Sequence, residues 1–249
     1  MYLNTLSRNT IIESLSQLTH LNENDILEAV NSSDIKKIYD RLDIDEVLIH
    51  HLSRRINGTE YEDTLDLHTL LITENVFSAF LKKYGFIFKS DDNINVDMYF
   101  LGEKYEFNKE DEPHHWAYAR TKGRLKYDSI LKYSDSCFNG FSIGDIGINC
   151  GYSKLKRAPE FIQDISSLLG VKEMLAEFSK ISSFYVMTYK LPINICIWDC
   201  TREVDFKEQL INSIYKYLKN GEVGSPYIRT NDSIRIQSEK LLECEELKW

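Results

Sequence analysis

The chain has no long hydrophobic stretch, and no segment approaches the roughly 18 to 20 apolar residues that a membrane span needs. Its net charge is −9 over 249 residues, so it offers little of the basic surface that binding to nucleic-acid phosphates requires. The first ten residues, MYLNTLSRNT, do not have the basic and then apolar pattern of a cleavable secretory signal. We therefore expect no membrane span and no nucleic-acid partner. The expected location is the cytoplasm, or a host cell reached by export without a cleavable signal.

Cysteine is also scarce, and five cysteines are scattered along the chain with no Cys-x-x-Cys pair. This spacing predicts neither a disulfide framework nor a metal site. The glycine-rich loops of P-loop and Rossmann proteins, GxxxxGK[S/T] and GxGxxG, are missing as well. A cysteine-dependent hydrolase that uses Cys137 or Cys200 is the third-ranked hypothesis, because buried thiols explain most of these cysteines more simply.

The remaining pattern is that of a mixed α and β protein. Residues 1–42 read as three short helices, each preceded or begun by an Asn, Ser or Asp that can cap free backbone N–H groups. Beyond them, β-branched and aromatic segments predict strands, and segments with helical spacing of apolar residues predict helices. We expect an α+β fold with an N-terminal helical arm, residues 1–42, and one domain, residues 43–249. The polar, aromatic segment 108–151 reads as surface loops that carry function.

One short stretch, VLIHHLSRRING (residues 47–58), carries the strongest functional signal. Residues 47–53 have strand composition, and Asn57-Gly58 supplies a turn. Because side chains alternate along a strand, His50 and His51 are expected to face opposite ways. The two histidines therefore do not form a metal clamp, and Ser53 is expected to share the face of His51.

The predicted strand carries His51-x-Ser53, and a helix and the glycine-bearing segment AFLKKYGFIF (residues 79–88) follow it. This order resembles the histidine-bearing branch of the ADP-ribosyltransferase family. The resemblance implies a split β-sheet core that binds NAD as co-substrate. It further implies that His51 contacts the adenosine ribose and that Ser53 holds the nicotinamide side. Arg54 would pair with the pyrophosphate, which suits guanidinium geometry.

The family also uses an aromatic residue that stacks on nicotinamide and a late glutamate that stabilises positive charge as the glycosidic bond breaks. Tyr99, Tyr105 and Tyr118 are all candidates for the stacking residue, and the sequence does not choose among them. Glu222, after a predicted helix end, is the preferred catalytic glutamate, and Glu239 is the alternative. The Ser-Thr-Ser element of the arginine-modifying branch is absent.

These features lead to two hypotheses of different classes. The first is an ADP-ribosyltransferase of the bacterial toxin or effector type that modifies a macromolecule, more readily a protein than a nucleic acid because of the acidic balance. The alternative is a non-catalytic interaction module, such as an immunity, defence or adaptor protein, whose acidic surface binds a basic partner. The sequence does not specify the oligomeric state.

Overall fold

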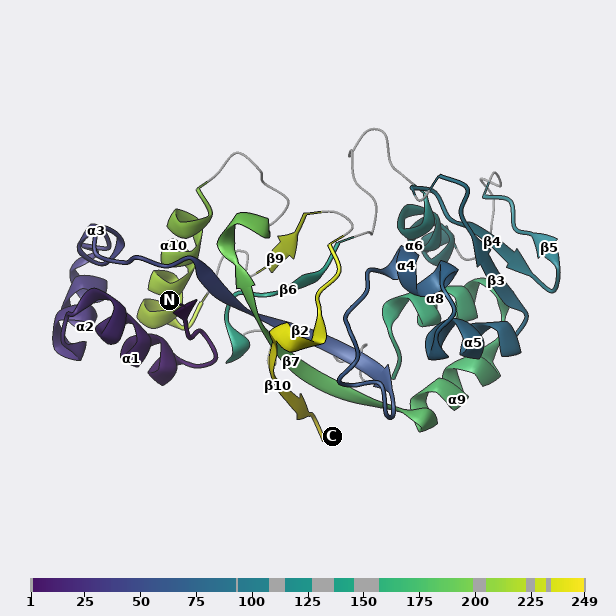
Figure 1. Ribbon diagram of the computed structural model, residues 1–249, viewed down its shortest axis with the longest axis horizontal. Helices are drawn as coiled ribbons and strands as arrows, with labels where there is room; N and C mark the ends of the chain where they lie inside the picture. The colour runs from purple at the N-terminus through teal and green to yellow at the C-terminus, as the bar shows by residue number, and fades with distance from the viewer. Residues whose placement is uncertain are drawn as a thin grey trace.

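Two long antiparallel strands, β2 (Glu46–Ile56) and β7 (Ser182–Pro192), run through the middle of the molecule (Figure 1). They pair residue by residue from Glu46 opposite Pro192 to Ile56 opposite Ser182. Both segments are rich in the β-branched and aromatic residues that favour a half-buried strand. The pair joins two lobes, one at each end of an elongated molecule.

The computed structural model describes residues 2–92, 94–107, 115–126, 137–145, 157–198, 205–222, 227–231 and 234–248. Within them, helices and mostly antiparallel strands alternate along the chain. The α+β class predicted from the sequence is therefore confirmed.

The larger sheet has seven strands, in the order β10-β7-β2-β6-β9-β8, and β1 pairs in parallel with β2. Its shorter members are β1 (Tyr2–Leu3), β6 (Asn139–Phe141), β8 (Cys196–Trp198), β9 (Tyr227–Thr230) and β10 (Leu241–Glu246). Strand β6 lies against β2 through the pair His50 and Phe141. Phe141, about 90 positions further along the chain, thus lies beside His50.

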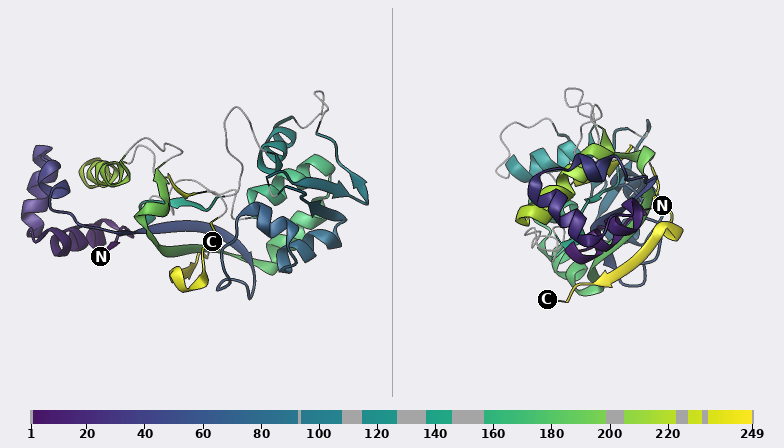
Figure 2. Two further views of the ribbon diagram at one scale, coloured as in Figure 1. Left: turned by 45° about the horizontal axis from the view of Figure 1, so that its top comes forward. Right: turned by 90° about the vertical axis from the view of Figure 1, so that its left-hand side faces the viewer.

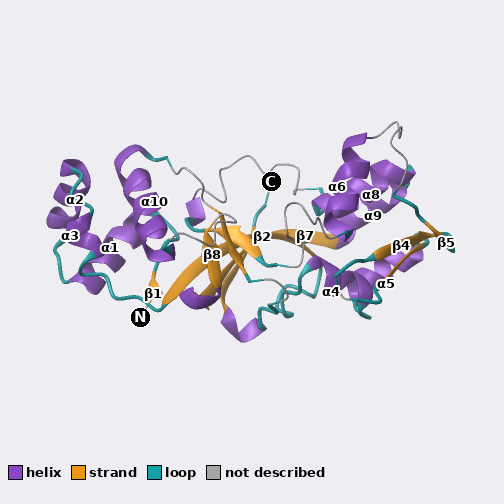
Figure 3. Cartoon of the chain, turned by 90° about the horizontal axis from the view of Figure 1, so that it is seen from above, coloured by secondary structure: helices purple, strands orange, loops and turns teal. Residues whose placement is uncertain are grey.

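Helices cover the sheet at the N-terminal end of the molecule (Figures 1 and 3). They are α1 (Arg8–Thr19), α2 (Glu23–Ser32), α3 (Lys36–Tyr39) and α10 (Phe206–Asn220). Ser7 caps α1 in a capping box with Thr10, which satisfies backbone N–H groups that the helix leaves free. The apolar faces of these helices share one hydrophobic cluster with the sheet. The three predicted N-terminal helices are present, and the boundary at residue 42 stays a prediction.

The second lobe has a hydrophobic cluster of its own, formed between residues 71 and 178. Its helices are α4 (Leu67–Ile72), α5 (Val76–Lys83), α6 (His115–Leu125), α8 (Glu160–Leu169) and α9 (Lys172–Ile181). Its sheet has the strands β3 (Phe86–Lys89), β4 (Asp97–Phe100) and β5 (Glu103–Lys104). Figure 2 shows β2 leading into this lobe and β7 leading out of it.

Two predicted elements differ from the structure. Strand β2 continues to Ile56, beyond the segment 47–53 predicted as strand, so Arg54 and Arg55 lie within it. The segment 108–151, expected as loops, contains helix α6 and strand β6. Strand β6 has only three residues and contains a glycine, so its composition does not favour a strand. Its pairing with the distant strands β2 and β9 stabilises it.

Candidate functional site

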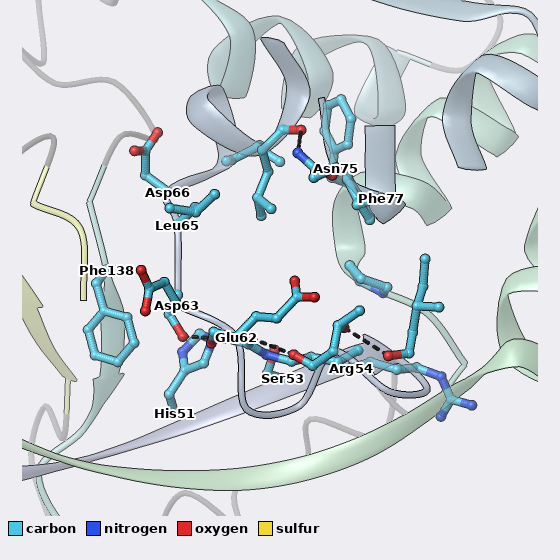
Figure 4. A pocket seen from close by; sticks show the side chains of 18 of the residues that line it. His51, Ser53, Arg54, Glu62, Asp63, Leu65, Asp66, Asn75, Phe77 and Phe138 are labelled. Carbon is cyan, nitrogen blue, oxygen red and sulfur yellow. Dashed lines mark hydrogen bonds between the residues drawn. The ribbon is translucent and has the colours of Figure 1, made fainter. Parts of the chain in front are cut away.

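A cavity of about 310 Å³ opens between strand β2 and the second lobe. One wall is strand β2 from His51 to Ile56 with the segment 59–66 that follows it, and Phe138 and Asn139 close one side (Figure 4). Most of the opposite wall comes from apolar side chains of the second lobe: Leu67, Leu70, Val76, Phe77, Phe161 and Phe178. Asn75, Arg124 and Glu160 of the same lobe also line the cavity, so the wall that faces the central strand is largely but not wholly apolar.

His51 lines this cavity, and its ring is held from one side. Its Nδ1 lies 2.6 Å from the backbone oxygen of Asn139, and its ring lies 4.8 Å from that of Phe138. A carbonyl oxygen only accepts hydrogen bonds, so Nδ1 carries the hydrogen. Burial lowers the pKa of His51 to about 4, which keeps the ring neutral near pH 7. Its Nε2 is then an acceptor, and no partner for it occurs among the described residues.

His50 belongs to the other face of the strand, as alternation predicted. Its ring is fully buried and bonds through Nδ1 to the hydroxyl of Thr188, 3.0 Å away, and through Nε2 to that of Thr5, 3.2 Å away. Burial also lowers the pKa of His50 to about 4. His50 therefore ties together strands β2 and β7 and the segment before α1, whereas His51 faces the cavity.

Ser53, two residues after His51, lines the same cavity. Its hydroxyl forms no hydrogen bond within the part of the chain that the structure describes, so it is available to a ligand. The spacing His51-x-Ser53 thus places one acceptor nitrogen and one hydroxyl along the same wall.

The two arginines that follow have different surroundings. Arg54 lies on the cavity wall, but its guanidinium donates to Ser182 Oγ at 2.8 Å and to the carbonyl oxygens of Ser179 and Ser182. Figure 4 shows that guanidinium turned away from the cavity. Arg55 shares the face of His51 and donates to the carbonyl oxygens of Thr59 and Glu62, each at 3.1 Å. Alternation alone would have assigned Arg55, rather than Arg54, to the face of His51.

Four carboxylates line the cavity, and three of them are bound by neighbouring groups. Asp63 accepts from the backbone N–H of Ser238 and pairs with Arg235, which together lower its pKa. Asp66 caps helix α4 by accepting from Thr69. Glu160 pairs with Arg120 and Arg124. The fourth carboxylate, that of Glu62, has no partner among the described residues.

The other residues predicted from the sequence lie elsewhere. Tyr99 is on β4 beside Lys89, and Tyr105 and Tyr118 pack on Phe107 within the second lobe. Glu222 is exposed just after helix α10, and Glu239 is exposed in the short helix Ser238–Lys240. None of these five residues lines the cavity. The structure therefore brings His51 and Ser53 together on the cavity wall, turns the guanidinium of Arg54 away from it, and leaves the predicted tyrosines and glutamates outside.

The cysteine and serine nucleophiles receive little support from the geometry. Cys137 lines the cavity but is buried and lies 3.7 Å from the side-chain oxygen of Asn139. Cys200 lies outside the described residues. The stretch GFSIG, residues 140–144, has the spacing of a serine nucleophile elbow, but Ser142 is fully buried and lacks the left-handed backbone that exposes such a serine.

The described residues show neither a metal cluster nor a membrane-spanning helix. No cluster of three or more His, Cys, Asp or Glu side chains that would hold a metal ion occurs in the described ranges. Among those same residues, no helix combines the length and the hydropathy needed to cross a membrane.

Comparison with known proteins leaves the chain without a family assignment. No protein-family model matches it, and neither the curated proteins nor the solved structures contain a significant match.

Proposed function

We propose that this protein is an NAD-dependent ADP-ribosyltransferase of the toxin or effector type that modifies a protein acceptor. One observation carries the proposal: the acceptor nitrogen of His51 and the free hydroxyl of Ser53 face a single cavity. An acceptor nitrogen suits a ribose hydroxyl, which donates a hydrogen bond. A serine hydroxyl both donates and accepts, as a carboxamide such as that of nicotinamide requires.

The size and lining of the cavity fit one end of NAD. Its volume of about 310 Å³ lies at the lower end of the roughly 300 to 1,000 Å³ typical of ligand pockets. A nucleoside-sized portion of the dinucleotide therefore suits the cavity, with the remainder beyond its mouth. The apolar wall formed by Phe77, Phe161 and Phe178 suits a flat ring.

The proposed reaction transfers ADP-ribose from NAD to an acceptor. The bond between the ribose carbon and the nicotinamide nitrogen breaks, and its electron pair leaves with nicotinamide. An acceptor hydroxyl, amine or water forms the new bond to that carbon and releases a proton. In this proposal His51 and Ser53 orient the ribose and the ring, and the surrounding walls limit the access of water.

In this proposal both lobes of the molecule contribute to the binding site. The larger sheet supplies His51 and Ser53, and the lobe that contains the smaller sheet supplies the facing wall. We assign the remaining roles by the family resemblance: Tyr99, Tyr105 or Tyr118 as the stacking residue and Glu222 or Glu239 as the catalytic acid.

A specific observation favours the second candidate, a non-catalytic interaction module. Both predicted acids, Glu222 and Glu239, are exposed and lie outside the cavity. A protein that retains the pocket but lacks a correctly placed acid would bind a ligand or partner without chemistry. The acidic balance of the chain then suits a basic protein partner.

Two measurements on the purified protein separate these candidates. A thermal-shift experiment with millimolar NAD tests binding, because a ligand that binds only the folded state raises its stability. Incubation with labelled NAD and a host-type lysate tests transfer and hydrolysis, with Glu222→Ala compared in parallel. A thermal shift without label transfer or NAD hydrolysis favours the interaction module, and no effect in any assay would rule out the NAD proposal.

A further inference from the structure

Glu62 presents an unpaired negative charge to the cavity. Figure 4 shows its carboxylate turned into the space between strand β2 and the side chains of Asn75 and Phe77. Glu62 lines the cavity and is exposed to solvent, and its carboxylate has no hydrogen bond or ion pair among the described residues. By contrast, the other three carboxylates of the cavity are bound by the side chains or backbone groups that surround them.

The backbone that carries Glu62 is held in place on both sides. Arg55 donates to the carbonyl oxygens of Thr59 and Glu62, and the N–H of Glu62 donates to Thr59. Two residues further on, Thr64 exchanges backbone hydrogen bonds of 2.9 and 3.1 Å with Ile236. The fold therefore fixes the backbone of Glu62 beside the cavity, although its carboxylate has no hydrogen bond or ion pair among the described residues.

Aromatic side chains form a large part of the wall that faces Glu62, and the charges that the second lobe adds to the cavity, Arg124 and Glu160, are paired with each other. Phe77 and Phe178 lie edge to face with their ring centroids 6.1 Å apart, and Phe161 lines the same wall. The faces of aromatic rings attract cations, and a carboxylate on the other side of the same space attracts them more strongly. A flat ring that carries a positive charge therefore fits this space better than the same ring without the charge.

We infer that Glu62 determines specificity in this cavity and makes it select a cationic ring, the N-ribosylpyridinium of oxidised NAD, over the neutral ring of NADH. This inference rests on the proposed function, because it assumes that the cavity holds the nicotinamide end. Glu62 is part neither of the His51-x-Ser53 motif nor of the pair of candidate catalytic glutamates, Glu222 and Glu239. Replacing the carboxylate by an amide of the same shape should remove the discrimination and leave the fold intact.

Isothermal titration calorimetry with NAD and with NADH tests the inference on three proteins: the wild type, Glu62→Gln and the matched control Glu60→Gln. Glu60 lies in the same segment, and its carboxylate accepts from the N–H of Gly58, a role that an amide oxygen also fulfils. We expect the wild type and Glu60→Gln to bind NAD about two- to fivefold more tightly than NADH, the range for a charge interaction at an exposed carboxylate. Glu62→Gln should lose most of that ratio through weaker NAD binding, with its Tm close to that of the wild type.

The outcomes separate this inference from the proposed function. Equal affinity of the wild type for NAD and NADH, or an unchanged ratio in Glu62→Gln, would overturn the role of Glu62 and leave NAD binding intact. The same loss of discrimination in Glu60→Gln would also overturn it, because the effect would then not depend on the carboxylate in the cavity. If the wild type binds neither nucleotide, the proposed function fails, and the inference fails with it.

Discussion

The Nδ1–H of His51 donates a hydrogen bond of 2.6 Å to the backbone oxygen of Asn139, 88 positions further along the chain. This bond joins the central strand β2 to the short strand β6 and determines which nitrogen of the ring faces the cavity. Because burial also keeps the ring neutral, His51 presents a lone pair rather than a positive charge. That distinction decides which ligand groups the residue can bind.

The first prediction concerns His51 itself. His51→Ala removes the acceptor nitrogen and part of the cavity wall, so the affinity for NAD should fall by about tenfold, the equivalent of one good hydrogen bond of about 1.4 kcal/mol. Calorimetric titration with NAD measures this change. His20→Asn is the matched control, because His20 is exposed at the end of helix α1 and has the left-handed backbone that asparagine tolerates. Similar NAD affinity in both variants would contradict a binding role for His51.

The sequence predicted the central strand and the division of its histidines, because both depend on local patterns. Composition marks β2 as a strand, and alternation separates His51 from His50 without any tertiary information. The same alternation assigns Arg55 to the face of His51, but the family resemblance directed attention to Arg54. Alternation along the strand therefore identified the correct arginine for this face, Arg55, whereas the family resemblance pointed to Arg54.

Asn139 and Glu62 could not be predicted from the sequence as cavity residues. Asn139 contributes a backbone oxygen, which every residue possesses, and its strand of three residues is stabilised by distant partners rather than by its own composition. Glu62 lies in an irregular segment whose path depends on Arg55 and on the bridge between Thr64 and Ile236. Contacts of this kind depend on tertiary structure, and a single sequence carries no local signal for them.

The second prediction concerns Gly140, which allows strand β6 to approach strand β2 closely. A Cβ at this position would lie 3.1 Å from the backbone oxygen of His50 and would overlap the side chain of Ile49. Gly140→Ala should therefore destabilise the protein by about 1 to 3 kcal/mol, measured by urea unfolding. It should also weaken NAD binding, because β6 positions the carbonyl oxygen that orients His51. Gly123→Ala is the control, since a Cβ there has no atom within 4 Å; equal stability of the two variants would argue against this packing role.

The third prediction concerns Arg55, whose guanidinium holds the segment that carries Glu62. Arg55→Gln removes the charged donors to the carbonyl oxygens of Thr59 and Glu62 and to the hydroxyl of Thr64. The expected loss of stability is about 1 to 3 kcal/mol. Hydrogen exchange of the amides in residues 59–64 should become faster, because the local opening of this segment costs less free energy. Unchanged exchange in this segment would show that the bridge between Thr64 and Ile236 is sufficient to hold it.

The fourth prediction concerns pH and follows from His50 and His51. In the unfolded chain a histidine titrates near pH 6.5, whereas burial lowers the pKa of both His50 and His51 to about 4 in the folded state. Between these two values the unfolded state binds more protons, so the free energy of unfolding falls as the pH falls from about 6.5 towards 4. Each histidine should contribute a loss of about 2 kcal/mol between pH 7.5 and 4.5.

Urea unfolding of the wild type, His50→Gln and His51→Gln at these two pH values measures the effect. Each variant should lose roughly half of the pH-dependent change that the histidines cause, even if its stability at pH 7.5 is lower than that of the wild type. Carboxylates with lowered pKa values, such as Asp92 at about 2, titrate below this window and contribute little to it. An equal pH dependence in the wild type and His50→Gln would mean that His50 is not held neutral by burial. A neutral His50 ring donates one hydrogen bond and accepts the other in its contacts with the hydroxyls of Thr5 and Thr188, so that result would mean that both ring nitrogens donate to these hydroxyls.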